Sequence, residues 1–183
     1  VGVAAISGDL TSGDRNNTRG VNWPGQEEEE LIDFDDVVVT NDFFNTMGIE
    51  IVAGRDFSDD LEKDKDNIIF NQMAIEQMGL EDPIGQTVQL WGSNRTIIGV
   101  VNDFHLESLY KDIKPAFFRS SSRRMNAVVK IETSKTMEML KTIETYYKEQ
   151  HNGLPLDYQF MDDVYNQLYV SEQRVSTLSK YFA

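Results

Sequence analysis

Two histidines, His105 and His151, carry the only imidazole groups in this 183-residue sequence. Histidine is the usual general base at neutral pH, so a catalytic site would be sought there first. His105 closes the run Asn102-Asp103-Phe104-His105 after a predicted strand, where a base could act together with Asp103. The pattern favours instead a histidine that is hydrogen-bonded at a strand end. His151 follows a predicted helix C-terminus, where the helix dipole stabilises a partly charged imidazole.

A second group of chemically capable residues is a set of four aspartates that could coordinate a cation: Asp59, Asp60, Asp64 and Asp66. An EF-hand loop that began at Asp64 would place Ile68 and Ile69 where an oxygen ligand and a glycine are required. The calcium pattern therefore fails. Lysines and a glutamate in the same stretch favour a solvated surface loop over residues 58–67, and we expect no metal.

The sequence lacks the motifs of several enzyme classes. It has no phosphate-binding glycine loop ending in lysine, no Gly-x-Ser-x-Gly elbow and no His-Glu-x-x-His pair. It contains no cysteine, which excludes disulfides, thiolate metal sites and cysteine nucleophiles. We therefore expect neither catalysis nor a cofactor.

Three adjacent aromatic pairs could form a platform for a ligand. They are Phe43 with Phe44, Phe117 with Phe118, and Tyr146 with Tyr147. At helical or strand spacing such residues usually belong to the core. An interface role for one of the pairs stays open.

The composition limits the partners. The formal net charge is −14, with 31 acidic and 17 basic residues, so the surface repels nucleic acid and anionic lipid. No stretch reaches the roughly 18 consecutive apolar residues of a membrane-spanning helix. The sequence begins without an initiator methionine or a signal peptide, which favours a fragment excised from a longer protein.

The elements that position these residues follow from periodicity and turn signals. The predicted strands cover residues 3–6, 31–39 with a bulge near 35–36, 68–70, 87–91, 95–101, 116–119, 127–131 and 158–161. The predicted helices begin after Thr40 or Asn41, after Asn71 and after Ser134, and a last one covers 163–183. Residues 7–22 are expected to form a long loop, and Gly92-Ser93-Asn94 the turn of a β-hairpin. The strand, helix and strand after residue 126 make a β-α-β unit.

The last predicted helix has apolar residues spaced alternately four and three apart. They are Val164, Leu168, Val175, Leu178 and Phe182, and Ser171 fills the one gap in the stripe. This spacing is typical of a helix that packs along a partner helix. No glycine or proline ends it, so we expect the helix to continue past Ala183.

Five segments, in order, resemble the extracytoplasmic domain of MacB/FtsX-like ABC transporter permeases. They are 41–49 running into 53–58, 71–74, 79 with 82–86, 98–105 with 113–115, and 160–163 with 168–169. The resemblance covers residues 40–183, whereas residues 1–39 match only loosely. Its structural motif residues are Gly54, Arg55, Phe57, Pro83, Gly85, Gly99, Asp103, Phe104 and Pro115.

The chemistry of these motif residues is structural. Gly54 and Gly85 permit backbone geometry that side chains would block, Pro83 fixes a turn, and the Asp103 carboxylate can satisfy backbone amides at a strand end. A signature made of turns and core residues implies a scaffold.

The resemblance implies an α+β fold with two lobes. A porter-like β-α-β lobe would comprise residues 1–53 and 125–183, with a terminal stalk helix. A smaller mixed α/β lobe would be inserted over 54–124.

The implied function is that of the periplasmic domain of an inner-membrane permease, located between its first and second transmembrane helices. The permease would pair with a second copy and couple to a separate ABC ATPase. The domain would transmit ATP-driven motion to a periplasmic adaptor or cargo during export. One alternative is a ligand- or peptide-sensing binding module, which needs a concave apolar pocket. Another is an enzyme that uses His105 with Asp103.

Overall fold

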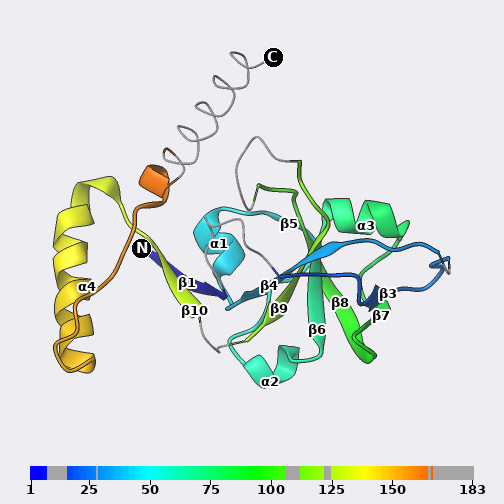
Figure 1. The fold of residues 1–183 in the computed structure, drawn as a ribbon, viewed down its shortest axis with the longest axis horizontal. Coiled ribbons are helices and arrows are strands. Elements are labelled where there is room, and N and C mark those ends of the chain that lie inside the picture. The colour runs from blue at the N-terminus through cyan, green and yellow to red at the C-terminus, as the bar shows by residue number, and fades with distance from the viewer. Residues whose placement is uncertain (8–15, 28, 106–111, 122–124, 165, 167–183) are drawn as a thin grey trace, which may run out of the picture. The chain divides into compact units, whose positions relative to one another are not determined.

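The computed structural model describes residues 1–7, 16–27, 29–105, 112–121, 125–164 and 166 (Figure 1). Its fold is mixed α+β, with a ten-stranded mixed sheet and few helices, which confirms the predicted class. Two compact units are present, one of residues 2–130 and one of residues 131–183 with Val1. The division into lobes at residues 54 and 124 stays a prediction.

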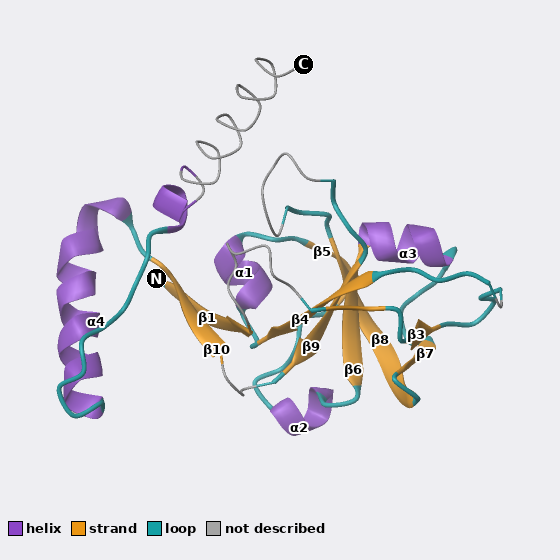
Figure 2. Ribbon diagram, viewed as in Figure 1, coloured by secondary structure: helices purple, strands orange, loops and turns teal. Residues whose placement is uncertain are grey.

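Apart from the 15-residue helix α4 and the nine-residue strand β8, the helices and strands of the described residues are short (Figure 2). The strands are β1 Gly2–Ser7, β2 Asn17–Thr18, β3 Val21–Asn22, β4 Phe34–Val39, β5 Ile51–Gly54, β6 Asn67–Asn71, β7 Thr87–Leu90, β8 Ser93–Val101, β9 Ala116–Ser120 and β10 Met125–Lys130. The helices are α1 Phe43–Met47, α2 Leu61–Asp64, α3 Gln72–Met78, the 3₁₀ turn Thr133–Lys135 and α4 Thr136–Gln150.

The strand order of the sheet is β10-β1-β4-β9-β6-β8-β7-β3, with β2 also on β4 and β5 also on β8. β4 with β9 and β6 with β8 are parallel pairs. β1 and β10 run antiparallel from Gly2 opposite Lys130 to Ser7 opposite Met125. Sequence-distant segments therefore share one sheet, including the first strand and the last.

Aromatic side chains fill the core of residues 2–130. Phe34, Phe43, Phe44, Phe70, Phe117 and Phe118 are all fully buried. The Phe34 ring meets those of Phe70 and Phe117 at centroid distances of 6.0 and 6.3 Å. The core interpretation is thus confirmed for two of the three aromatic pairs, but Tyr146 is 66% exposed.

Helix α3 forms as the sequence predicts. The Asn71 side chain accepts a hydrogen bond from the Ala74 amide at 3.1 Å, and Gly79 ends the helix at φ +65°. For α1 the predicted stop at Gly48 is confirmed, but the predicted cap at Thr40 or Asn41 is wrong. Asp42, at φ +60°, takes the N-cap position without a side-chain cap bond.

One predicted feature of the sheet, a bulge in β4, is absent, and another, the turn between β7 and β8, lies at different residues. β4 pairs with β9 residue by residue from Asp35 to Val39, so the predicted bulge near 35–36 is wrong. The hairpin turn is Trp91-Gly92, not residues 92–94, because Leu90 pairs with Ser93. Both turn residues have positive φ, +51° and +79°. Such a turn matches the twist of its two strands.

Residues 131–166 contain helix α4 but not the predicted β-α-β unit. The helix is confirmed, although Lys135, not Ser134, stands at its N-cap. Residues 158–160 form no strand and 161–164 are helical, so the strand predicted over 158–161 is wrong. A strand needs neighbouring backbone partners, and alternation of apolar residues does not provide them. Most of the helix predicted over 163–183 lies outside the described residues.

None of the helices in the described part of the chain has the length and apolar character needed to cross a membrane.

Candidate functional site

Two glycines bring the chain close to the sheet where the predicted motif begins. Gly54, at φ +75°, lies opposite Gly99 across β5 and β8. A Cβ atom at Gly54 would overlap the Ile98 carbonyl oxygen, and one at Gly99 would lie 2.5 Å from the Arg55 carbonyl oxygen. The Arg55 amide bonds that Ile98 carbonyl at 2.9 Å. Only glycines fit this close approach of β5 to β8, which directs the Arg55 side chain toward residues 58–67.

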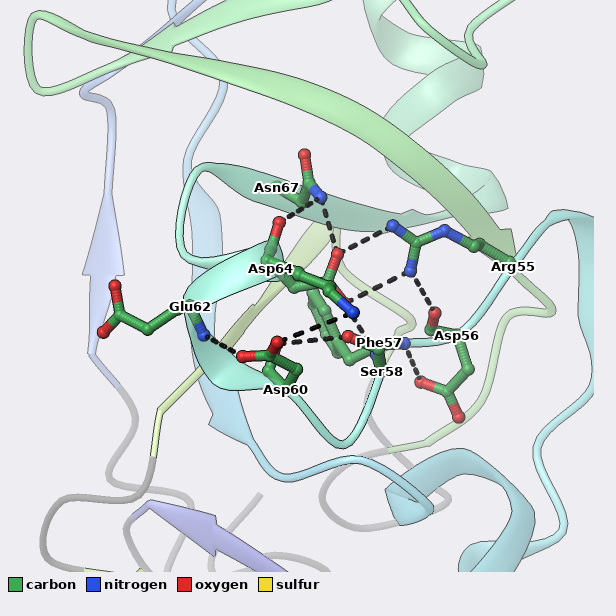
Figure 3. Close-up of polar contacts among 9 residues, drawn as sticks. Arg55, Asp56, Phe57, Ser58, Asp60, Glu62, Asp64 and Asn67 are labelled. Carbon is green, nitrogen blue, oxygen red and sulfur yellow. Dashed lines mark hydrogen bonds and ion pairs between the residues drawn. The ribbon is translucent and has the colours of Figure 1, made fainter.

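Arg55 meets a buried carboxylate (Figure 3). Its Nη2 and Nη1 atoms donate to Asp64 Oδ1 and Oδ2 at 2.8 and 3.2 Å. The Ser58 amide donates to Asp64 Oδ2 and the Asn67 Nδ2 to Asp64 Oδ1, each at 2.6 Å. The Asp64 side chain is fully buried, whereas 53% of the Arg55 side chain is exposed. Four donors therefore hold one buried carboxylate in place.

This network sets the charge state of Asp64. Burial alone would raise the pKa of Asp64, but the hydrogen bonds from Arg55, Ser58 and Asn67 outweigh it and hold that pKa well below its usual range. The hydrogen bond to Asp64 in turn raises the pKa of Arg55. Asp64 is thus a structural anchor that is ionised at neutral pH. The sequence did not reveal the anchoring role of Asp64, because the loop around it is acidic. The signal that could have indicated it was Arg55, a motif residue for which no acidic partner had been assigned.

The predicted solvated loop over 58–67 is therefore wrong in part. It contains α2, which Asp60 caps by accepting from the Glu62 amide at 3.2 Å, and the buried Asp64. Asp59 accepts from Asn41 Nδ2 at 2.5 Å, and Asp66 pairs with Arg95 at 2.8 Å. The four aspartates face different partners. Within the described ranges no three acidic or histidine residues group as a metal site would require.

Phe57 and Asp56 complete the motif loop. Phe57 is buried at 5% exposure, and its amide donates to Asp56 Oδ1 at 2.6 Å. Burial raises the pKa of Asp56, and the neighbouring carboxylates of Asp42 and Asp64 add to that effect. Asp56 and Asp64 are therefore adjacent carboxylates with pKa shifts in opposite directions.

Asp103 caps a helix from the end of β8. Its Oδ1 accepts from the Met73 amide in the first turn of α3 at 2.9 Å, which confirms the expected role at a strand end. The carboxylate considered as the partner of His105 is therefore engaged with backbone. His105 itself is half-buried, and Phe104 stacks on Phe118 at a centroid distance of 5.9 Å.

Asn71 and Pro115 join the start of α3 to the start of β9. Asn71 Oδ1 accepts from the Ala116 amide at 2.9 Å, and its Nδ2 donates to the Lys114 carbonyl at 2.9 Å. The Pro115 carbonyl accepts from the Asp35 amide at 2.9 Å. These bonds fix three strand ends against one helix.

The predicted turn after α3 is confirmed. The Gln86 amide donates to the Pro83 carbonyl at 3.1 Å, and Gly85 takes φ +85°. The Gly85 amide donates to the Ile97 carbonyl at 2.8 Å, which connects the turn to β8.

The β1–β10 ribbon joins the rest of the sheet through a narrow junction. β1 and β4 share the single residue pair Ile6 and Val39. The Thr40 Oγ1 accepts from the Ala5 amide at 2.8 Å, and the Thr40 amide donates to the Ala5 carbonyl at 3.0 Å. Ser7 Oγ accepts from the Val38 amide at 3.2 Å. We call this group, residues 5–7 with 38–40, the junction.

An open depression of about 640 Å³ lies beside the C-terminal end of α3. It is lined by Pro24, Gly25, Glu27, Glu29, Glu30, Gln77, Met78 and Gly79. Three of these are glutamates, so the depression differs from the mostly apolar pockets that bind small ligands.

The sequence and the fold both have relatives. Residues 1–143 match the family described as the MacB-like periplasmic core domain. No curated protein matches the chain.

Three solved structures share the fold. The extracellular domain of the ABC-type transporter YknZ from Gram-positive bacteria is 15% identical, with a TM-score of 0.58 over 84% of this chain and 78% of that one. The periplasmic region of MacB from Actinobacillus actinomycetemcomitans is 15% identical, with a TM-score of 0.57 over 91% and 75%. A domain of a protein described as a permease from Porphyromonas gingivalis is 14% identical, with a TM-score of 0.55 over 90% and 81%.

Proposed function

Because this chain belongs to the family of MacB-like periplasmic core domains and is the extracytoplasmic domain of an ABC transporter permease, we propose that it transmits ATP-driven conformational change to partners or cargo during export. ATP would be hydrolysed on a separate nucleotide-binding domain or subunit. The domain would act as a mechanical element between the membrane and the periplasm.

The observation that carries this proposal is the antiparallel pairing of β1 with β10. Gly2 lies opposite Lys130, so the polypeptide enters and leaves the sheet of residues 2–130 at neighbouring positions. Displacement of the segments on either side of this sheet would therefore be delivered to one two-stranded ribbon. Such a ribbon is a suitable input for a mechanical signal.

The junction supports the next step of the proposal. Ile6 and Val39 form the single ladder pair between the ribbon and β4, and Thr40 adds hydrogen bonds to Ala5. Beyond β4 the strands pair more extensively, over five residue pairs with β9. A ribbon with a narrow connection to a broad sheet can pivot as a rigid arm, with the junction as its hinge.

The proposed partners follow from the family context. A second copy of the permease would complete the complex, and the ATPase would couple through the membrane region. A periplasmic adaptor or cargo would contact the domain. The permease would reside in the inner membrane, and this domain would lie in the periplasm.

The proposed two-lobe organisation, with one lobe of residues 1–53 and 125–183 and the other of residues 54–124, predicts limited-proteolysis cuts near residues 54 and 124. First cuts elsewhere would contradict that boundary.

Engineered disulfides in the full-length permease with its ATPase test the hinge. The domain has no cysteine, so I6C/V39C introduces one bridge across the junction. V3C/V129C is the matched control, because it places a bridge inside the ribbon. Antiparallel partners lie within the Cα separation that a disulfide spans.

We expect oxidised I6C/V39C to lose export while the ATPase still turns over, and reductant to restore export. V3C/V129C should export normally in both states. Normal export by a fully cross-linked I6C/V39C permease would exclude the hinge. If the domain were instead a sensing module, the isolated chain would bind a ligand with unchanged affinity when the junction is locked.

A further inference from the structure

Trp91 has an unusual backbone conformation. It stands at the first position of the β7–β8 turn with φ +51°, a region that bulky side chains rarely adopt. Asparagine or glycine is the usual residue at this position of a two-residue hairpin turn. The Trp91 side chain is also 54% exposed, so burial does not account for its presence. A strained residue of this kind persists when its contacts offset the strain.

Those contacts lead to a short segment that crosses the sheet. We call residues 17–22 the strap. At one end Asn17 and Thr18 pair with β4, and at the other end Val21 and Asn22 pair with β7. In the strand order β4 and β7 are separated by β9, β6 and β8. The strap therefore closes these strands into a ring around a buried core that includes Val21.

Trp91 fastens the middle of the strap. Its amide donates to the Gly20 carbonyl at 2.9 Å, and its Nε1 donates to Thr18 Oγ1 at 3.0 Å. Gly20 lies directly against the indole, and a Cβ atom there would overlap the ring. Because Gly20 does not have a positive φ, a larger residue is excluded by this contact and, less severely, by Thr18 Oγ1, which would lie 3.1 Å from the added Cβ atom.

The indole also contacts a residue of β9, Arg119. The Arg119 guanidinium lies 5.0 Å from the ring centroid, where it is attracted to the π face. Asp36 holds that guanidinium through two bonds of 2.8 and 2.7 Å. The indole thus contacts the strap, the hairpin and β9 together.

We propose that Trp91 is a clasp that keeps the strap closed and makes the strap and the β7–β8 hairpin open as one cooperative unit. The contacts of the indole with the strap offset the strain of the turn. When the strap leaves, the hairpin tip loses that support and loosens with it. Opening would convert the ring into an open sheet and free the edges of β4 and β7.

Hydrogen exchange on this chain tests the clasp. W91N relieves the turn strain, because asparagine suits the position, and it removes the indole contacts. We expect amides in residues 17–22 to exchange at least about tenfold faster, since the lost hydrogen bond to Thr18 alone contributes on the order of a tenfold change. Amides of the hairpin, residues 87–96, should exchange at an unchanged or slower rate. L31N is the control, because Leu31 is another exposed apolar residue, at 64%.

A double substitution separates the clasp from general damage. G20A should also accelerate exchange in the strap, because its Cβ displaces the indole. In the G20A/W91N variant the added effect of G20A should be much smaller, since the obstructing ring is absent and the milder contact with Thr18 Oγ1 remains. Unchanged exchange of the strap in W91N, or an equal effect of G20A with and without Trp91, would overturn the proposal.

Discussion

The two compact units differ in how they use apolar residues. In residues 2–130, six phenylalanines are fully buried between strands and helices. Helix α4, Thr136–Gln150, has no buried residue, and Met137 on its predicted apolar face is 79% exposed. The difference shows that an amphipathic pattern creates a core only when a second surface is supplied. The sheet supplies its own surfaces, whereas α4 and the described residues that follow it, 151–164, which contain no strand, do not.

The largest effect expected from this comparison is on the core of residues 2–130. Phe70 is fully buried and contacts both Phe34 and Phe117. F70A should lower the free energy of unfolding by about 3–5 kcal/mol. M137A in α4 is the matched control and should change it by less than about 0.5 kcal/mol. Chemical denaturation measures both, and comparable losses would contradict the contrast between the units.

The next effect concerns the buried carboxylate. D64A removes the acceptor of the Ser58 amide and the Asn67 side chain. It should cost about 2–3 kcal/mol of the free energy of unfolding, because those donors lose a charged partner. D66A is its control, since the Asp66 side chain is 71% exposed and pairs with Arg95 at the surface. Exposed pairs contribute at most about 1 kcal/mol. An equal loss of unfolding free energy in D64A and D66A would contradict the expectation that the buried Asp64 network stabilises the protein more than the exposed Asp66 pair.

The same carboxylate predicts a dependence on pH. The pKa of Asp64 is lowered in the folded protein, so its contribution to stability is complete above its unfolded pKa of about 3.9. That contribution is lost as pH falls below this value toward the folded pKa. Asp56 has a raised pKa in the folded protein and acts oppositely at mildly acidic pH. Urea unfolding from pH 6 to pH 2 should therefore show a weaker acid loss in D64A than in the parent chain. A parallel loss would exclude Asp64 as its source.

The smallest effect is expected in α4. Lys148 pairs with Glu144 one turn earlier at 2.7 Å, and both side chains are about half-exposed. K148A should reduce the stability of the helix by about 0.3–0.5 kcal/mol, the usual contribution of such a pair. Circular dichroism should detect a slight loss of helix, while the unfolding of residues 2–130 stays unchanged. A change in that unfolding would show that the two units are energetically coupled.

Much of the fold and part of the site could be predicted from local patterns. Asn71 and Gly79 bound α3, and Gly48 ends α1, because caps and stops depend on a few adjacent residues. The roles of Gly54 and Gly85 were also correct, since glycine, which lacks a Cβ atom, is the residue that adopts positive φ without a steric cost. The predicted strand over 158–161 was wrong because alternation indicates a face but not a neighbouring strand.

The sequence by itself determined the class of most elements, the Asn71 cap of α3, the glycine stops of α1 and α3 and the family resemblance, all of which rest on residue types at short spacing. Tertiary structure alone decided that acidic Asp64 is buried, that Thr40 joins the ribbon to β4, and that Trp91 covers Gly20. The same indole donates to Thr18 Oγ1, 73 residues away along the chain. Burial and hydrogen bonding between such distant residues depend on strand order and register, which no local pattern specifies.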